Sequence, residues 1–375
     1  MIDFRTSQSR PEPTLADWLA RWHLDLWLLT LLGMLSSIGL LILYSASGHS
    51  LEQVLSQAER IVMGLIIMTA VAQAPSEIYR AAAPWLYGIT LILLILTLML
   101  GSTAKGAQRW LDLGVLRFQP SELMKLAMPL MVAAFLHQRQ LPPRISTILI
   151  TLVIIAIPTA LIAKQPDLGT AMLVIAAGVF ALYFSGFAWK WILGALGLIG
   201  AAAPIIWSKM HDYQRQRILT LLDPESDPLG AGYHITQSKI AIGSGGLFGK
   251  GFLNGSQAKL EFLPESHTDF IFAVYSEEFG LLGIILLLTL YLAIVGRCLF
   301  IAMRAQDSFQ RLLAASLAMT FFVYVFINMG MVIGLLPVVG VPLPLVSYGG
   351  TSAVSLLTSF GILMSIQTHR KLLSK

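Results

Sequence analysis

The chain is poor in charged residues. Asp, Glu, Lys and Arg make up 12% of its 375 residues, whereas a soluble domain carries about 25%. It has one cysteine, Cys298, so no internal disulfide bond can form, and its place in an apolar run is typical of a small buried residue. The sequence also lacks a zinc-ligand pattern and an internal repeat, and we find no cleavable signal peptide. These absences argue against a soluble enzyme, a disulfide-stabilised scaffold and a zinc module.

Apolar residues, by contrast, make up 56% of the chain and gather in long runs. A membrane-spanning helix needs about 20 such residues, and helices satisfy their own backbone groups inside a bilayer. We therefore predict an all-α polytopic membrane protein, a single integral membrane domain over 1–375 with about ten transmembrane helices. The second and fourth apolar segments are short, so we expect them to be tilted or extended by flanking residues. The segments are 24–44, 60–73, 84–100, 121–136, 145–163, 168–185, 189–207, 269–300, 311–336 and 347–367.

Two polar segments accompany these runs. Residues 1–23 are predicted to form a cytoplasmic tail with an interfacial helix, because Leu15, Trp18 and Trp22 recur at helical spacing. Residues 208–268 are the long polar segment of the chain, and we predict a large periplasmic loop there, between helices 7 and 8.

The distribution of basic residues indicates the orientation in the membrane. With an even number of spans and the amino terminus inside, 13 of the 25 Lys and Arg residues lie on the inner side. Six of the others lie in loop 208–268, which is close to the length beyond which loop charge no longer sets orientation. We therefore predict that both termini are cytoplasmic.

Four basic residues nevertheless gather at one outer loop, which suggests an anionic partner such as a lipid diphosphate: Lys105, Arg109, Arg117 and Lys125. Nucleic acid is not expected, because no basic domain stands clear of the membrane.

This outer cluster extends into the fourth span. Pro120 marks the start of the helix. Glu122 and Lys125 are three residues apart, so they share one face of it. The pair either neutralises itself and stabilises packing, or lines a cavity that grips a diphosphate. In the second case Arg109 suits a phosphate and Trp110 suits the face of a sugar ring.

Two further stretches combine turn residues with polar groups. Residues 164–170, Lys-Gln-Pro-Asp-Leu-Gly-Thr, form a short outer link, for which turn chemistry and a cavity lining are equally good explanations. Residues 243–251, Gly-Ser-Gly-Gly-Leu-Phe-Gly-Lys-Gly, resemble a phosphate-binding loop, but Ser244 replaces the first Gly of that motif and Gly251 follows the lysine. We interpret the second stretch as a flexible loop able to move over a membrane-embedded site.

Helix-breaking residues are concentrated between Asn328 and Thr351. Six Gly and Pro residues precede the sequence Ser347-Tyr348-Gly349-Gly350. Such a density at membrane depth favours a broken or re-entrant path that lines a cavity, and a tight loop between two spans is the alternative.

Asp269 lies where the long polar loop gives way to the eighth apolar segment. A carboxylate at membrane depth costs about 2.5–3.5 kcal/mol on insertion scales, so it usually faces a cavity or a partner. Glu261, Glu265, His267 and Thr268 offer proton-handling and hydrogen-bonding groups nearby. The alternative is that Asp269 merely caps a helix. One histidine with two carboxylates does not define a metal site, although a divalent cation that bridges a lipid diphosphate needs only one or two protein carboxylates.

In this order, on a chain with ten apolar runs, these stretches resemble the SEDS family (shape, elongation, division and sporulation) over nearly the whole chain. Residues 264–272, Pro-Glu-Ser-His-Thr-Asp-Phe-Ile-Phe, resemble the catalytic loop of that family. Residues 328–352, which end in Ser-Tyr-Gly-Gly-Thr-Ser, resemble its signature. Residues 105–114, Lys-Gly-Ala-Gln-Arg-Trp-Leu-Asp-Leu-Gly, are closer to its elongation member than to its division member.

The resemblance implies a peptidoglycan glycosyltransferase of the bacterial inner membrane that polymerises lipid II during cell elongation. The 4-hydroxyl of the acceptor N-acetylglucosamine attacks the anomeric carbon of the donor N-acetylmuramic acid, the diphosphate lipid leaves, and inversion yields a β-1,4 link. Such an attack needs a base near the hydroxyl and cations near the diphosphate. By resemblance Asp269 is the general base, and Arg109, Lys125, Lys164 and Lys239 contact the diphosphate. The other implied substrate contacts are Trp110, Gln119, Glu122, Gln165, Asp167, Glu261, His267, Thr268, Ser347 and Tyr348.

The resemblance also implies a partner, a class B penicillin-binding protein that acts as transpeptidase, and beyond it the elongation machinery. Two other functions are considered. A lipid II flippase also explains ten spans and a cationic cavity, but it requires charged groups along the inner half of the path, whereas the polar residues here cluster on the outer side. A non-catalytic scaffold leaves Asp269 and the cationic cluster unexplained.

Overall fold

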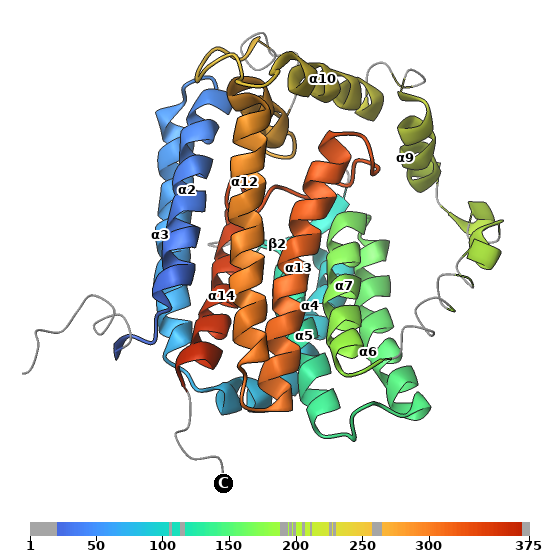
Figure 1. Ribbon diagram of the computed structural model, residues 1–375. Coiled ribbons are helices and arrows are strands. Elements are labelled where there is room, and N and C mark those ends of the chain that lie inside the picture. Colours follow the sequence, from blue (N-terminus) through green and yellow to red (C-terminus); the bar gives the residue numbers. More distant parts are fainter. Residues whose placement is uncertain are drawn as a thin grey trace, which may run out of the picture.

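A bundle of long helices makes up most of the protein (Figure 1). The computed structural model describes residues 21–104, 107–112, 117–187, 194, 197, 200–204, 207–210, 212–224, 227, 230–256 and 265–369. The long helices are α2 (Leu26–Ala46), α3 (Leu51–Ala72), α4 (Ser76–Leu100), α5 (Pro120–His137), α6 (Ile145–Lys164), α7 (Leu168–Phe184), α12 (Ile271–Met303), α13 (Ser308–Val332) and α14 (Gly350–Thr368). In this part of the chain, seven helices are long and apolar enough to cross a membrane, which confirms a mostly helical polytopic protein.

The predicted apolar segments coincide with these helices to within a few residues, apart from the second and the third, whose helices begin nine and eight residues earlier. The segment predicted at 60–73 begins nine residues earlier, because the hydroxyl of Ser50 accepts a hydrogen bond from the Gln53 amide and starts α3 at Leu51. Most of segment 189–207 lies outside the described residues, and so does nearly all of the predicted tail 1–23.

The two most buried helices, α5 and α13, lie at the centre of the bundle. Most of their side chains are buried, whereas α3, α4 and α6 bury only a few each and expose Leu, Ile and Met along their outer faces. An apolar outer face is the surface that a lipid environment requires. The polar groups carried by α5 and α13 are therefore enclosed by the other helices.

The two ends of the described chain meet at one end of the bundle. The imidazole rings of His23 and His369 stack with their centroids 3.8 Å apart. Nearby, the Asp25 carboxylate caps α2 by accepting the Leu28 amide at 2.8 Å, and it forms an ion pair with Arg297 of α12. The first and last described residues thus lie at the same end of the bundle.

A small antiparallel sheet joins α4 to α5, and the sequence analysis did not predict it. Its strands are β1 (Ser102–Ala104), β2 (Ala107–Asp112) and β3 (Arg117–Phe118), in the order β1-β2-β3. Because side chains alternate along a strand, Arg109 and Trp110 on β2 point to opposite faces of the sheet. Two short helices, α9 (Asp212–Leu222) and α10 (Ala231–Ser244), belong to the long polar loop, and α10 packs on α12 and α13 (Figure 1).

Residues 333–349 follow an irregular path back into the bundle. Their side chains at Val341, Leu343 and Leu345 are buried. The hydroxyl of Tyr291, well inside α12, donates to the Pro344 carbonyl at 2.7 Å, and the Leu345 backbone packs against Gly39 in the middle of α2. The segment is therefore re-entrant, as its helix breakers predict, and it is more than a tight loop between two spans.

The first two residues of the glycine-rich sequence 243–251 belong to α10, which ends at Ser244. The other seven, residues 245–251, are called the glycine-rich stretch, and they do not stand over the bundle as a separate flexible loop. Helix α12 is broken at Gly280, where φ is 62° and ψ is −161°. The broken helix is completed by the glycine-rich stretch: the Lys250 and Gly251 amides donate to the carbonyls of Glu277 and Glu278, both at 3.0 Å. This stretch is thus part of the α12 packing, which corrects its interpretation as a mobile cover.

Candidate functional site

Asp269 lies in a tight turn, residues 265–270, that immediately precedes α12. Three different elements hold this turn. Ser266 Oγ donates to the Ala46 carbonyl at the end of α2 (3.0 Å), the His267 carbonyl accepts the Tyr348 amide (2.9 Å), and the Asp269 carbonyl accepts Asn328 Nδ2 of α13 (2.9 Å). The backbone at Asp269 is therefore fixed by tertiary contacts.

Asp269 does not occupy the N-cap position of α12. The N-cap residue is Phe270, one position later, and no side-chain hydrogen bond caps the helix there. A Cβ placed on Gly340 of the re-entrant segment would lie 3.5 Å from Asp269 Oδ2, so the glycine leaves room for a methyl-sized group beside that oxygen. The Asp269 side chain is partly exposed. Asp269 is therefore a turn residue that precedes the cap, with one carboxylate oxygen beside the re-entrant segment.

Thr268 and His267 complete the turn. Thr268 Oγ1 donates to the Glu265 carboxylate at 2.6 Å, and Glu265 itself adopts a positive φ of 57°. The ring of His267 meets the ring of Tyr348 edge-on with centroids 6.1 Å apart. Ser347 Oγ accepts the Leu343 amide at 2.7 Å. The candidate residues of the Asp269 turn and those at positions 347 and 348 are therefore neighbours.

Helix α3 adds two polar residues that the sequence analysis did not single out. The Arg60 guanidinium lies over the Tyr348 ring, 4.6 Å from its centroid, and its Nη1 is buried with no hydrogen-bond partner among the described residues. Gln57 Nε2 donates to the Ser347 carbonyl at 3.3 Å, and its Oε1 accepts the Gly349 amide at 3.3 Å. The Arg60 guanidinium therefore places a cation beside the residues that contact the Asp269 turn, and its Nη1 is still able to donate hydrogen bonds.

Glu122 and Lys125 form a buried ion pair on α5, as their spacing predicts. Lys125 Nζ lies 2.8 Å from Glu122 Oε1 and donates to the Tyr324 hydroxyl at 3.3 Å. Ser355 of α14 donates to Glu122 Oε2 at 2.7 Å. The ammonium has three donors and uses two of them in these contacts, so one is left for an anion. Ser355 lies seven residues after Tyr348, so the start of α14 connects this pair to the Asp269 turn.

Arg109 joins the small sheet to the link between α6 and α7. Its Nη2 donates to the Pro166 carbonyl at 2.6 Å, and its Nε lies 3.8 Å from Asp167 Oδ2. Gln119 Nε2 donates to the same carboxylate at 3.1 Å. Asp167 also caps α7 by accepting the Thr170 amide at 3.2 Å, so it serves as a turn residue and as a partner of Arg109.

The other candidates are placed less centrally. Gln165 is buried and donates to the Leu94 carbonyl at 3.1 Å, and Trp110 is half-buried in β2. Lys164 is exposed at the end of α6. Lys239 is exposed on α10, and its side chain lies against Gly334 at the start of the re-entrant segment. Glu261, like Lys105, lies outside the described residues.

His234 of α10 packs against the residue that follows Asp269. Its ring stacks on Phe270 with centroids 5.5 Å apart. Burial lowers the pKa of this imidazole below its ordinary value near 6.5, and the nearby carboxylates of Glu265 and Asp227 partly oppose that effect. The neutral imidazole is therefore the form that this packing favours.

Comparison with known proteins decides the family. The model of the cell cycle protein family of FtsW, RodA and SpoVE matches residues 23–372. The chain belongs to this family. It is 56% identical over 354 residues to the peptidoglycan glycosyltransferase MrdB of Escherichia coli K12, a match that covers 94% of this chain and 96% of the relative. It is 37% identical over 364 residues to a probable peptidoglycan glycosyltransferase FtsW of Trichlorobacter lovleyi, covering 93% and 94%.

Solved structures of the FtsW/RodA/SpoVE family have the same fold. The rod shape determining protein RodA of Thermus thermophilus superposes with a TM-score of 0.71 at 27% identity, covering 92% of this chain and 98% of that one. A chain of a peptidoglycan synthase complex, solved to describe the coordination of polymerization and crosslinking, gives a TM-score of 0.81 at 28% identity, covering 92% and 99%. The predicted SEDS membership and the affinity to the elongation member are confirmed.

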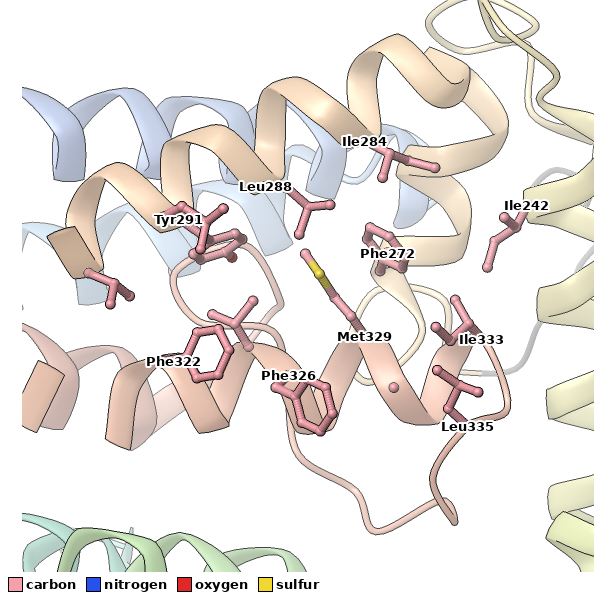
Figure 2. A pocket seen from close by; sticks show the side chains of 14 residues that line it. Ile242, Phe272, Ile284, Leu288, Tyr291, Phe322, Phe326, Met329, Ile333 and Leu335 are labelled. Atoms are coloured by element: carbon pink, nitrogen blue, oxygen red, sulfur yellow. The ribbon is translucent and has the colours of Figure 1, made fainter. Parts of the chain in front are cut away.

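An apolar cavity of about 300 Å³ opens between α12, α13 and α10 (Figure 2). Phe272 connects it to the Asp269 turn, and Ile284, Leu288, Phe326 and Met329 form its walls. It is lined by apolar and aromatic side chains with no carboxylate, lysine or arginine, so it cannot hold a diphosphate or supply a base. The polar candidate residues therefore lie outside this cavity, at the Asp269 turn, on α5 and at the link between α6 and α7.

No group of three or more metal-ligating side chains occurs in the part of the chain that the structure describes. The cations near the candidate site are side chains: Arg60 over Tyr348, Lys125 beside Glu122, and Arg109 beside Asp167. A ligand held among them would be anionic.

Proposed function

We propose that the chain is a peptidoglycan glycosyltransferase that polymerises lipid II into β-1,4 glycan strands during cell elongation. The observation that carries the proposal is the 56% identity, over 94% of the chain, to a protein named as a peptidoglycan glycosyltransferase. The arrangement around Asp269 agrees with it, because the carboxylate is partly exposed and the Arg60 guanidinium lies over the neighbouring Tyr348 ring.

In this proposal Asp269 is the general base. It accepts the proton of the acceptor 4-hydroxyl while the hydroxyl oxygen attacks the anomeric carbon from the face opposite the diphosphate. The backbone contact with Asn328 and the space left by Gly340 favour this role, since the first fixes the residue and the second admits a hydroxyl beside Oδ2. His267 and Thr268 adjoin the base and would contact the sugar.

Cationic side chains would hold the diphosphate and stabilise its charge as the bond to the sugar breaks. Lys125 has a donor left over from its contacts with Glu122 and Tyr324. The Arg109 guanidinium is oriented by Pro166 and Asp167. Lys164 and Lys239 are exposed and would reach the phosphate groups from the rim. The remaining proposed substrate contacts are Trp110, Gln119, Glu122, Gln165, Asp167, Glu261, Ser347 and Tyr348.

A divalent cation on the lipid diphosphate is compatible with this site, because such ions usually take one or two protein carboxylates and complete their shell with phosphate and water. Chelation tests it directly. Polymerisation that continues undiminished in excess EDTA removes the cation from the mechanism.

We further propose ten transmembrane helices in one integral domain, with the seventh at 189–207 and the periplasmic loop at 208–268. The contact between His23 and His369 supports two ends on one side, and the basic residues of the inner segments support the cytoplasmic side. Cysteines introduced at the two ends and in loop 208–268, labelled in intact cells with an impermeant reagent, test the arrangement: only those in the loop should react.

A class B penicillin-binding protein is the proposed partner, and beyond it the elongation machinery. The support is the fold shared with a chain of a peptidoglycan synthase complex that couples polymerization to crosslinking. The flippase alternative is not favoured, because the curated relatives are named as glycosyltransferases.

The test uses the purified protein with its transpeptidase partner and lipid II. Glycan strands resolved by gel electrophoresis support the proposal. If no strands form, but the protein carries labelled lipid II across the membrane of a vesicle, the proposal fails and the flippase replaces it.

A further inference from the structure

The break in α12 divides the helix into two parts with different neighbours. Residues 271–279 form a short segment that directly follows the Asp269 turn, and the long apolar part begins after Gly280. A helix break leaves carbonyl and amide groups without partners inside the helix. A short segment with such an end has no rigid connection to the rest of the helix, so its orientation depends on what replaces those bonds.

The glycine-rich stretch replaces them on both sides of the break. In addition to the two amides given to Glu277 and Glu278, the carbonyls of Gly246 and Leu247 accept the amides of Leu281 (2.9 Å) and Leu282 (3.1 Å). Glycine is needed at Gly249, whose φ is 78° and whose Cβ would collide with the Glu278 carbonyl. The glycines that first suggested a phosphate loop are thus explained by close packing against a broken helix.

One ionic cluster locks this arrangement. The Glu277 side chain is fully buried, and its Oε1 accepts Lys250 Nζ at 2.6 Å together with the amide and the hydroxyl of Ser256, both at 2.9 Å. Lys250 Nζ also donates to Ser256 Oγ at 2.9 Å. All these donors come from the glycine-rich stretch and the residues after it, while the acceptor belongs to the short segment of α12.

We propose that Lys250 and Glu277 form a clamp that positions Asp269 for catalysis. The clamp fixes the carboxyl end of segment 271–279, while Asn328 and the stack of His234 on Phe270 fix its amino end. Asp269 immediately precedes this segment, so loosening one end moves the base relative to the sugar. This inference rests on the proposed function. Lys250 is a positioning residue and does not itself contact the substrate.

Lys250→Met is the informative variant, because it keeps the length of the side chain and removes the charge. Ser256 and Ser244 still donate to Glu277, so the buried carboxylate keeps partners and the protein should fold. In the polymerisation assay with the transpeptidase partner, we expect kcat to fall about tenfold or more while KM for lipid II changes less than about twofold, since a misplaced base affects the transition state and not ground-state binding. Lys250→Arg should restore kcat. Lys209→Met, at an exposed lysine of the same loop, is the matched control.

Hydrogen exchange gives a readout that does not depend on activity. The clamp predicts faster exchange of the amides in 265–279 in Lys250→Met, with wild-type exchange in α13 and in the Lys250→Arg variant. Glu277→Gln and the double variant complete a cycle in which the two changes are not additive. If Lys250→Met cannot be purified, Glu277→Gln serves in its place with the same expectations.

Two results for Lys250→Met would overturn the clamp. One is an unchanged kcat, and if KM for lipid II also rises, Lys250 is a substrate contact. The other is unchanged hydrogen exchange of the amides in 265–279. Absence of polymer from the wild-type protein would instead count against the proposed function, and exchange alone would then decide whether the clamp holds segment 271–279.

Discussion

Removal of the Lys125 ammonium should destabilise the protein strongly. Lys125 and Glu122 are each 7% exposed, and their charged atoms lie 2.8 Å apart. At that distance the attraction is about 6 kcal/mol for an effective dielectric constant of about 20, and it offsets the loss of hydration of both groups. Lys125→Met keeps the aliphatic stem but leaves the Glu122 carboxylate buried with the Ser355 hydroxyl as its remaining side-chain donor in the described residues. We expect the free energy of unfolding to fall by about 3–5 kcal/mol.

A double variant shows whether the loss of stability comes from the unpaired Glu122 carboxylate or from the loss of Lys125 packing. In the double variant Glu122→Gln with Lys125→Met, no buried charge is left, so most of the stability should return, to within about 1–2 kcal/mol of wild type. The assay is unfolding by SDS titration in mixed micelles. Lys209→Met, at an exposed position, should change stability by less than about 0.5 kcal/mol. Two results would refute this explanation of the pair. One is a fall of less than about 1 kcal/mol in the free energy of unfolding of Lys125→Met. The other is a double variant that is less stable than both single variants, Glu122→Gln and Lys125→Met.

Three further outcomes follow from the contacts of Asn328, Arg109 and His234. Asn328→Leu removes the donors to the carbonyls of Asp269 and Val341, so the free energy of unfolding should fall by about 2–6 kcal/mol, and an unchanged SDS midpoint would contradict this. Arg109→Lys keeps the charge but loses the fork that reaches Pro166 and Asp167, so kcat/KM for lipid II should fall about tenfold; full activity would show that the fork is dispensable. The pKa of His234 lies below its ordinary value near 6.5. The folded protein is therefore most stable above about pH 6.5 and loses stability as the pH falls below it, because the unfolded chain takes up the proton first. The melting temperature of His234→Gln should fall less than that of the wild type between about pH 7.5 and pH 5.5.

The sequence predicts the long helices well because their signal is strong and local. Runs of about 20 apolar residues have few alternatives to a spanning helix. The start of α3 was missed because Glu52, Gln53 and Gln57 interrupt the apolar run, although the cap at Ser50 is a local signal that marks it. The three-stranded sheet was missed because its strands have three, six and two residues, too few for a clear alternation of apolar and polar side chains.

The site was predictable where its residues are close in sequence and much less so where the fold brings them together. Glu122 and Lys125 share a helix face, so their pairing follows from spacing. Arg60 gives no local signal, because its partner Tyr348 lies 288 residues later in the chain. The same is true of the glycine-rich stretch, because the break that it completes lies at Gly280, some thirty residues later.

Asp269 is proposed as the base of a lipid II polymerase, and one comparison tests this role. The most direct measurement compares glycan polymerisation by wild type and by Asp269→Asn, each purified with the transpeptidase partner, with lipid II binding measured on the same samples. The substitution keeps the size of the side chain and the backbone contact with Asn328. The account predicts loss of polymer, by a factor of about 100 or more, with binding retained. Polymerisation by Asp269→Asn at the wild-type rate would contradict it.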